Sequence, residues 1–163
     1  GCPPDVGTIK LNSDAAFRAD SGISHAGAIA RDHREVVVFS LSKQIGCCGA
    51  VEEAEAPTLL AGLQTLSDLH MGPIVADTDC TFLSNELRPG ASNLSAWYPV
   101  IADIKTELVK FSTAQVNYTS RNQNKMAHLL AARARSQEDM IMMASVPDDL
   151  AAALAADPVL AQE

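Results

Sequence analysis

The first forty residues alternate apolar and polar positions in short runs. Ile9 and Leu11 alternate with Lys10 and Asn12, which is the period of a strand with one buried face. Two further runs rich in apolar residues follow at positions 23–31 and 35–41, each after a short turn-like connection. Such connections join antiparallel neighbours. The pattern therefore predicts a meander of three antiparallel strands, the first within residues 7–17.

After residue 52 the apolar period lengthens to three or four residues, which is typical of a helix. Leucines line one face of it: Leu59, Leu60, Leu63 and Leu66. We expect Pro57 in its first turn, where the missing N–H matters little. The apolar run 74–76 then predicts a fourth strand, ending in Asp77-Thr78-Asp79. Because it is reached through a helix, this strand should lie parallel to the first.

Helices dominate the rest of the pattern. A short helical piece is predicted over residues 82–87, and a clear amphipathic helix over 97–111, with this apolar stripe: Trp97, Val100, Ile101, Ile104, Leu108 and Phe111. Residues 115–119 alternate as a fifth strand, and Asn124 is expected to cap a helix reaching Ala134. The element order predicts an α/β fold with a mixed five-stranded sheet, three antiparallel strands followed by parallel ones, flanked by helices.

Composition divides the chain into two parts. The 163 residues suit one domain, and no apolar run approaches the roughly 20 residues that cross a bilayer, so we expect no membrane association. We predict a domain over residues 1–136 and an acidic, Ala- and Met-rich tail over 137–163, with a short helix at 150–156. The tail holds six acidic residues and no Lys or Arg, which leaves 14 acidic against 12 basic residues in the domain. The net charge of −8 is therefore mostly the tail's, and it does not exclude a nucleic-acid partner.

Three carboxylates fall where the predicted fold converges. Asp14 lies in the first strand, Glu55 in the first turn of the leucine-rich helix, and Asp79 at the carboxyl end of the fourth strand. Like charges this close repel one another unless a cation lies among them, and oxygen ligands select Mg²⁺ or Mn²⁺. Two such ions about 4 Å apart promote in-line displacement at phosphorus. Phosphodiester hydrolysis is the predicted reaction class.

Six motifs, in order across residues 8–135, resemble those of the plant reverse-transcriptase-associated ribonuclease H domain, a retroelement-derived family. They are KLNSDAA at 10–16, GAIARD at 27–32, AEA at 54–56, DTDC at 77–80, WY at 97–98 and RNQNKMAHLLA at 121–131. The resemblance implies a ribonuclease H-like fold. It also implies metal-dependent cleavage of the RNA strand in RNA–DNA hybrids by a two-metal-ion mechanism.

By this resemblance, Asp14, Glu55 and Asp79 match the catalytic, metal-binding acids, with Asp79 favoured over Asp77. His128 occupies the place of a fourth acid in bacterial and retroviral relatives. Since imidazole is a poorer Mg²⁺ ligand than a carboxylate, we assign His128 to proton transfer or product release. Ala15 and Glu35 depart from the family, which usually has glycine at both positions.

The remaining predictions concern partners. Recognition of the hybrid would rest on backbone shape and ribose hydroxyls, with four nucleic-acid contacts proposed: Arg31, Arg121, Asn124 and Lys125. His25, His33 and His70 are interpreted as surface residues. The four cysteines show no metal or disulfide pattern, which favours an intracellular, reducing compartment, and a monomer is expected. The alternative is a catalytically inactive nucleic-acid-binding or interaction domain, which the departures at Ala15 and Glu35 and the acidic tail support.

Overall fold

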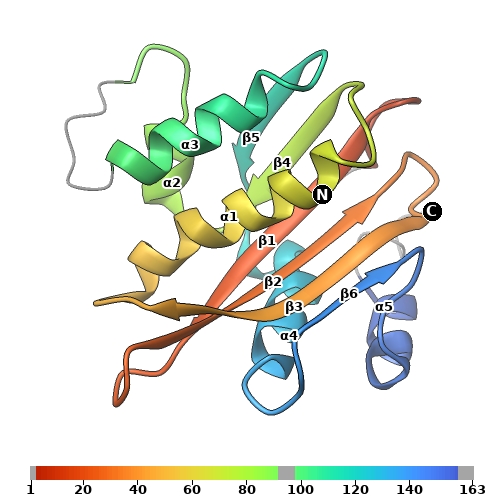
Figure 1. The fold of residues 1–163 in the computed structure, drawn as a ribbon. Helices are drawn as coiled ribbons and strands as arrows, with labels where there is room; N and C mark the ends of the chain where they lie inside the picture. The colour runs from red at the N-terminus through yellow and green to blue at the C-terminus, as the bar shows by residue number, and fades with distance from the viewer. Residues whose placement is uncertain (1–2, 92–97, 158–163) are drawn as a thin grey trace.

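The computed structural model describes residues 3–91 and 98–157 and shows a mixed sheet with helices on both faces (Figure 1). Its strands are β1 Ile9–Phe17, β2 Ile23–Arg31, β3 Val37–Cys47, β4 Ile74–Thr78, β5 Ala114–Tyr118 and β6 Met140–Met143. Its helices are α1 Val51–Ser67, α2 Thr81–Glu86, α3 Tyr98–Leu108, α4 Lys125–Arg133 and α5 Ala151–Ala155, with short 3₁₀ turns η1 Arg121–Asn124 and η2 Asp148–Leu150. The α/β prediction is confirmed.

Strand β1 is central in the sheet, whose order is β5-β4-β1-β2-β3-β6. It pairs antiparallel with β2, placing Asp14 opposite Gly27, and parallel with β4, placing Ser13 opposite Thr78. The predicted meander and the predicted parallel pairing are both confirmed. The parallel pairing brings the carboxyl ends of β1 and β4 to the same place.

Helix α1 covers one face of the sheet together with α3, while α4 lies on the other face (Figure 1). Its leucines Leu59, Leu63 and Leu66 are fully buried, as the periodicity indicates. The helix begins earlier than expected, at Val51, with Glu52 and Glu53 in a first turn that favours negative charge. Pro57 and Glu55 therefore lie in the second turn, and the first-turn prediction for both is wrong.

The backbone of helix α4 packs directly against the backbone of β2 at Gly27. A Cβ atom on Gly27 would lie 2.1 Å from the carbonyl oxygen of Ala127 and 2.2 Å from the backbone nitrogen of Ala131. Real Cβ atoms do not come this close to backbone, so this contact requires glycine. The Ser42 hydroxyl donates to the Leu130 carbonyl at 2.7 Å and joins the helix to β3 as well.

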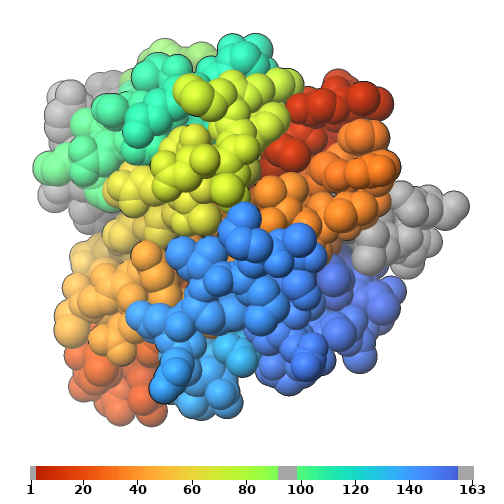
Figure 2. Space-filling model, turned by 45° about the vertical axis from the view of Figure 1, so that its right-hand side comes forward, coloured from red at the N-terminus to blue at the C-terminus, as the bar shows by residue number. Residues whose placement is uncertain are grey.

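The predicted acidic tail packs onto the domain over residues 137–157 and contributes a strand to its sheet. Its strand β6 pairs antiparallel with β3, giving six strands instead of the predicted five. Val146 and Leu150 pack against Ile29 and Leu130 beneath α4. Figure 2 shows the C-terminal segments, in blue, forming a continuous surface with the rest of the domain. The predicted short helix is present as η2 and α5.

Arg31 is buried, so the prediction that it contacts phosphate is wrong. Its side chain is 1% exposed, and its Nη1 donates to Asp157 Oδ2 at 3.0 Å. Its Nε lies 3.8 Å from Oε2 of Glu35, whose φ of 64° is in the left-handed region that favours glycine. The position where the family usually has glycine therefore keeps the glycine-like backbone and adds a buried carboxylate beside Arg31.

The amphipathic helix is confirmed as α3, with Ile101 and Ile104 fully buried. Trp97 lies outside the described residues, and nothing is described of the Tyr98 side chain. In the described ranges, every helix is too short or too polar to traverse a bilayer.

We predict that Asp157→Ala lowers the free energy of unfolding by about 3 kcal/mol or more, because Arg31 would keep a buried charge without its closest partner. The matched control is Asp149→Ala, which breaks the Arg133 pair at a carboxylate whose side chain is 60% exposed and should lower it by less than about 1 kcal/mol. Urea unfolding measures both. Equal losses would contradict the prediction.

Candidate active site

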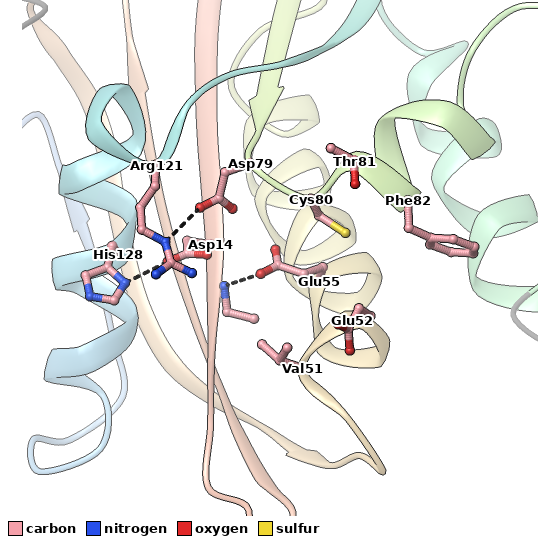
Figure 3. Close-up of a pocket in the computed structure, with 11 residues that line it drawn as sticks. Asp14, Val51, Glu52, Glu55, Asp79, Cys80, Thr81, Phe82, Arg121 and His128 are labelled. Atoms are coloured by element: carbon pink, nitrogen blue, oxygen red, sulfur yellow. Dashed lines mark hydrogen bonds and ion pairs between the residues drawn. The ribbon is translucent and has the colours of Figure 1, made fainter.

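Asp14, Glu55 and Asp79 converge at one end of the sheet. One carboxylate oxygen from each lies within 4.8 Å of the other two. They line a cavity of about 280 Å³ that opens between the N-terminal end of α1 and the start of α4 (Figure 3). Its other lining residues are Ala15, Val51, Glu52, Cys80, Thr81, Phe82, Arg121 and His128.

Each acid is positioned by a different element. Asp14 lies in β1, and Asp79 follows the last residue of β4, so the parallel pairing of these strands brings the two together. Glu55 projects from α1, and its Oε1 accepts a hydrogen bond from the backbone N–H of Ala15 at 3.2 Å. Ala15 departs from the family's glycine, but the bond uses only its backbone. The substitution therefore leaves Glu55 anchored to β1.

Electrostatics make the cluster unfavourable as three anions. Burial, followed by the charges of Asp14 and Asp79, raises the pKa of Glu55 to about 9. Burial and Asp14 also raise the pKa of Asp79, while Arg121 opposes this shift. At neutral pH the cluster alone therefore holds a proton on Glu55. A cation bound among the carboxylates would stabilise their ionised forms, and Glu55 would then lose its proton.

The donor set fits a hard divalent cation. Glu55 Oε2 is buried and has no hydrogen-bond partner in the part of the chain that the structure describes, so it is available to a cation. Oxygen ligands of Mg²⁺ lie at about 2.1 Å, so two of them on one ion are at most about 4.2 Å apart. The observed separations are below 4.8 Å, and cis oxygens on one octahedral ion are about 3 Å apart, so the carboxylates would either draw closer around one ion or share two ions about 4 Å apart.

His128 joins the cluster from α4. Its Nδ1 lies 3.0 Å from Asp14 Oδ2, and its side chain is 52% exposed at the rim of the cavity. Figure 3 shows the imidazole beside Asp14, on the side opposite Glu55. It is thus placed to exchange protons between the site and solvent without lying among the three carboxylates.

Of the predicted nucleic-acid contacts Arg121 and Lys125, only Arg121 lines the cavity. Arg121 lies over the cavity, its Nε 3.9 Å from Asp79 Oδ2 and its side chain 86% exposed, so the guanidinium is accessible to a ligand. Lys125 is exposed on α4 but does not line the cavity, and its role remains a prediction.

Asn124 occupies the predicted N-cap position of α4, but its side chain is buried and is neither a capping group nor an accessible contact for nucleic acid. Its Nδ2 donates to the Ser13 carbonyl, its Oδ1 accepts from Asn12, and its side chain makes no cap bond to α4. The amide instead fastens the start of α4 to β1, next to Asp14. From the sequence alone, an asparagine that caps a helix cannot be distinguished from one that bonds the helix start to a neighbouring strand.

Asp77 lies outside the cluster. Its Oδ2 is 3.6 Å from Lys10 Nζ, and both residues are buried. The preference for Asp79 over Asp77 agrees with this geometry. Sequence reasoning missed the cavity lining by Glu52 and Phe82, since neither belongs to a motif.

Sequence comparison identifies the family. The profile of the family described as "Reverse transcriptase-like" matches residues 12–134, which include all three acids and His128. The chain belongs to this reverse transcriptase-like family. No curated protein matches its sequence significantly. The family match ends before β6, so the C-terminal segment of this family member lies beyond the matched region.

Solved structures similar to this reverse transcriptase-like domain show the same fold. RNase H1 from the halophilic archaeon Halobacterium salinarum aligns with a TM-score of 0.72 at 20% identity, covering 79% of this chain and 98% of that one. An RNase H domain from Mycobacterium tuberculosis gives 0.70 at 17%, covering 78% and 92%. LC11-RNase H1, from compost, solved with an RNA/DNA hybrid, gives 0.69 at 17%, covering 77% and 95%. The fold is thus ribonuclease H-like.

The raised pKa of Glu55 predicts a pH-dependent stability. Without divalent metal, the folded protein holds a proton on Glu55 that the unfolded chain releases near pH 4.5. Stability should therefore fall as pH rises from about 5 to 8, by up to about 1.4 kcal/mol per pH unit. Urea unfolding in EDTA measures this slope. Glu55→Gln should flatten it, whereas Glu52→Gln, at an exposed carboxylate of the same cavity, should not. The same slope in wild type and Glu55→Gln would contradict the assignment.

Proposed function

We propose that this domain is a metal-dependent endonuclease that hydrolyses the RNA strand of RNA–DNA hybrids. One observation carries the proposal: three carboxylates from three elements line one cavity and place an oxygen each within 4.8 Å of the other two. Bound Mg²⁺, or Mn²⁺, would supply an activated water and stabilise the leaving oxygen. Asp14, Glu55 and Asp79 would hold these ions.

The remaining residues of the cavity have distinct tasks. His128 bonds Asp14 on one side and meets solvent on the other, so it is suited to move a proton or to assist product departure. Arg121 presents its guanidinium above Asp79, where it would contact a phosphate oxygen of the substrate. Neither residue needs to ligate metal.

Support for an RNA–DNA hybrid as substrate comes from the family and from the related folds. LC11-RNase H1, which shares this fold, was solved in complex with an RNA/DNA hybrid. We extend this partner to the present chain, acting as a monomer that reads backbone shape and ribose hydroxyls. The motif set, with His128 in the fourth catalytic position, further supports an origin in a plant retroelement.

Two observations favour activity over the inactive alternative. The Ala15 substitution leaves the N–H that holds Glu55 in place. Glu35 adopts the backbone conformation of the glycine it replaces and lies with Arg31, away from the acidic cluster. Neither departure from the family disturbs the carboxylates.

A hybrid-cleavage assay with Mg²⁺ or Mn²⁺ tests the proposal. Wild type should cut the RNA strand, and Asp14→Asn should reduce the rate by at least about 10²-fold, since loss of even an indirect metal contact has effects of 10 to 100-fold. Asp77→Asn, at a nearby buried acid outside the cluster, should retain activity within a few-fold. Absence of wild-type cleavage at high enzyme concentration would reject the enzyme and favour a binding domain.

His128→Ala should lower the turnover number by at least about tenfold, since general acid–base groups contribute 10² to 10⁴-fold and solvent partly replaces them. The Mg²⁺ concentration for half-maximal rate should change far less than in Asp14→Asn, because the metal keeps its three carboxylates. Steady-state rates across a Mg²⁺ series measure both quantities. A large shift in the Mg²⁺ requirement would instead make His128 a ligand.

A further inference from the structure

The sheet has a free edge at β6, a strand that lies beyond the region matched by the family (Figure 1). One side of β6 pairs with β3, and within residues 3–91 and 98–157 no strand pairs with its other side. Natural proteins often protect such an edge with a lysine, a proline or a bulge. Met140–Met143 contains no charged residue or proline, and its pairing with β3 shows no register shift. Its short length is the protection that remains.

The backbone groups at this free edge belong to Ile141 and Met143. In an antiparallel ladder, alternate residues direct both their N–H and their C=O to the same side. The N–H of Ala144 donates to the Val38 carbonyl of β3 at 2.9 Å, so the backbone groups of residues 140, 142 and 144 face β3. Ile141 and Met143 therefore direct two N–H donors and two carbonyl acceptors to the free edge.

The same two residues carry the exposed apolar side chains of the strand. Ile141 and Met143 are each 52% exposed. They pair with Leu41 and Phe39, which are fully buried in the core that α1 covers. Because paired residues lie on one face of a sheet, Ile141 and Met143 extend this apolar face to its edge. One added strand would bury both side chains and bond their backbone groups.

A second copy of β6 fits this edge in antiparallel orientation. When the Met142 residues of the two copies lie opposite each other on a two-fold axis, Ile141 of each copy lies opposite Met143 of the other. Every N–H and carbonyl that these residues direct to the free edge then has a partner in the other strand. The exposed side chains also form apolar cross-strand pairs, which stabilise a sheet.

Charge favours this orientation over a parallel one. Glu138 and Asp139 precede β6, and no acid follows it before Asp148. Parallel pairing would place each acid beside its own copy. Antiparallel pairing about Met142 separates the two Glu138 residues by roughly 27 Å at the strand rise, well beyond the screening length of about 8 Å. It brings Glu138 instead toward the end of the other copy at which the β2–β3 turn carries Arg34, whose side chain is 70% exposed.

We infer that two copies of this domain associate through antiparallel pairing of their β6 strands. Strands this short bury an area typical of transient interfaces, below about 1,200 Å² in total, so the association is weak and depends on concentration. No residue of β6 lines the active-site cavity, so each copy keeps its own carboxylate cluster accessible. At the low enzyme concentrations of a cleavage assay, the chain acts as the monomer proposed above.

Sedimentation equilibrium between about 5 and 500 µM protein tests the association, since weak contacts have micromolar to millimolar dissociation constants. The weight-average mass of wild type should rise from the 17.2 kDa of one chain toward twice that value. Ile141→Lys should weaken association at least about tenfold, because a lysine on an edge strand opposes pairing. The matched control is Val109→Lys, which adds the same charge at an apolar residue that is 80% exposed and follows α3. This variant should associate as wild type does.

Amide hydrogen exchange in wild type locates the contact without a mutation. The Ile141 and Met143 amides should exchange rapidly in dilute protein and at least about fivefold more slowly at concentrations where the dimer predominates. The Met142 amide faces β3 and should be protected at both concentrations. A rise in mass without added protection of Ile141 and Met143 would place the contact elsewhere and overturn the inference.

Two further outcomes would also overturn it. A wild type that stays monomeric over the whole range would exclude a second copy as the occupant and favour an extended strand of another protein. Equal association of Ile141→Lys and Val109→Lys would exclude the β6 edge. Neither measurement uses nucleic acid or metal, so its result is independent of the proposed function.

Discussion

Helix α4 lies so close to the sheet that only a residue without a side chain fits beneath it at Gly27. Several bonds depend on that approach: Ser42 reaches the Leu130 carbonyl, and Asn124 reaches both Ser13 and Asn12. His128 meets Asp14 from the same helix. A displacement of α4 by the width of a methyl group would therefore break the packing of this face and the connection between α4 and the acidic cluster together.

The acidic cluster is a second constraint, and it acts against stability. Folding brings Glu55 into a buried position beside two other acids, where its charged form is disfavoured and its pKa rises to about 9. The sheet tolerates this because β1 and β4 are fixed by their pairing and Glu55 by the N–H of Ala15. An arrangement that is unfavourable for the apoprotein is preorganised for a divalent cation. The same three residues thus link the stability of the fold to the chemistry proposed for it.

The sequence determined most of this architecture because its strongest signals are local. Alternation marked β1, an apolar run after a turn marked β2, leucine spacing marked α1, and the motif order placed Asp14, Glu55 and Asp79 together. The features that the sequence did not predict depend on contacts between residues far apart in the chain. Strand β6 is only four residues long and uniformly apolar, so no period identifies it before β3 is placed beside it. Arg31 looks like any basic surface residue until the chain returns with Asp157, 126 residues later. Asn124 and His25, which is buried and not at the predicted surface, likewise derive their environments from elements distant in sequence.

The acidic C-terminal segment shows why net charge is a poor guide to the partner of this domain. Asp157 binds buried Arg31, Asp149 binds Arg133, and Asp139 accepts the N–H of Gln44, so these three acids are engaged in holding β6 and α5 to the domain. At physiological ionic strength charges are screened over about 8 Å, so a ligand responds to the groups near it and not to the total of −8. The basic group at the cavity is Arg121, whose side chain is exposed at the rim. A polyanion approaching this end of the sheet would therefore meet an exposed guanidinium group beside a carboxylate cluster that a divalent cation would neutralise.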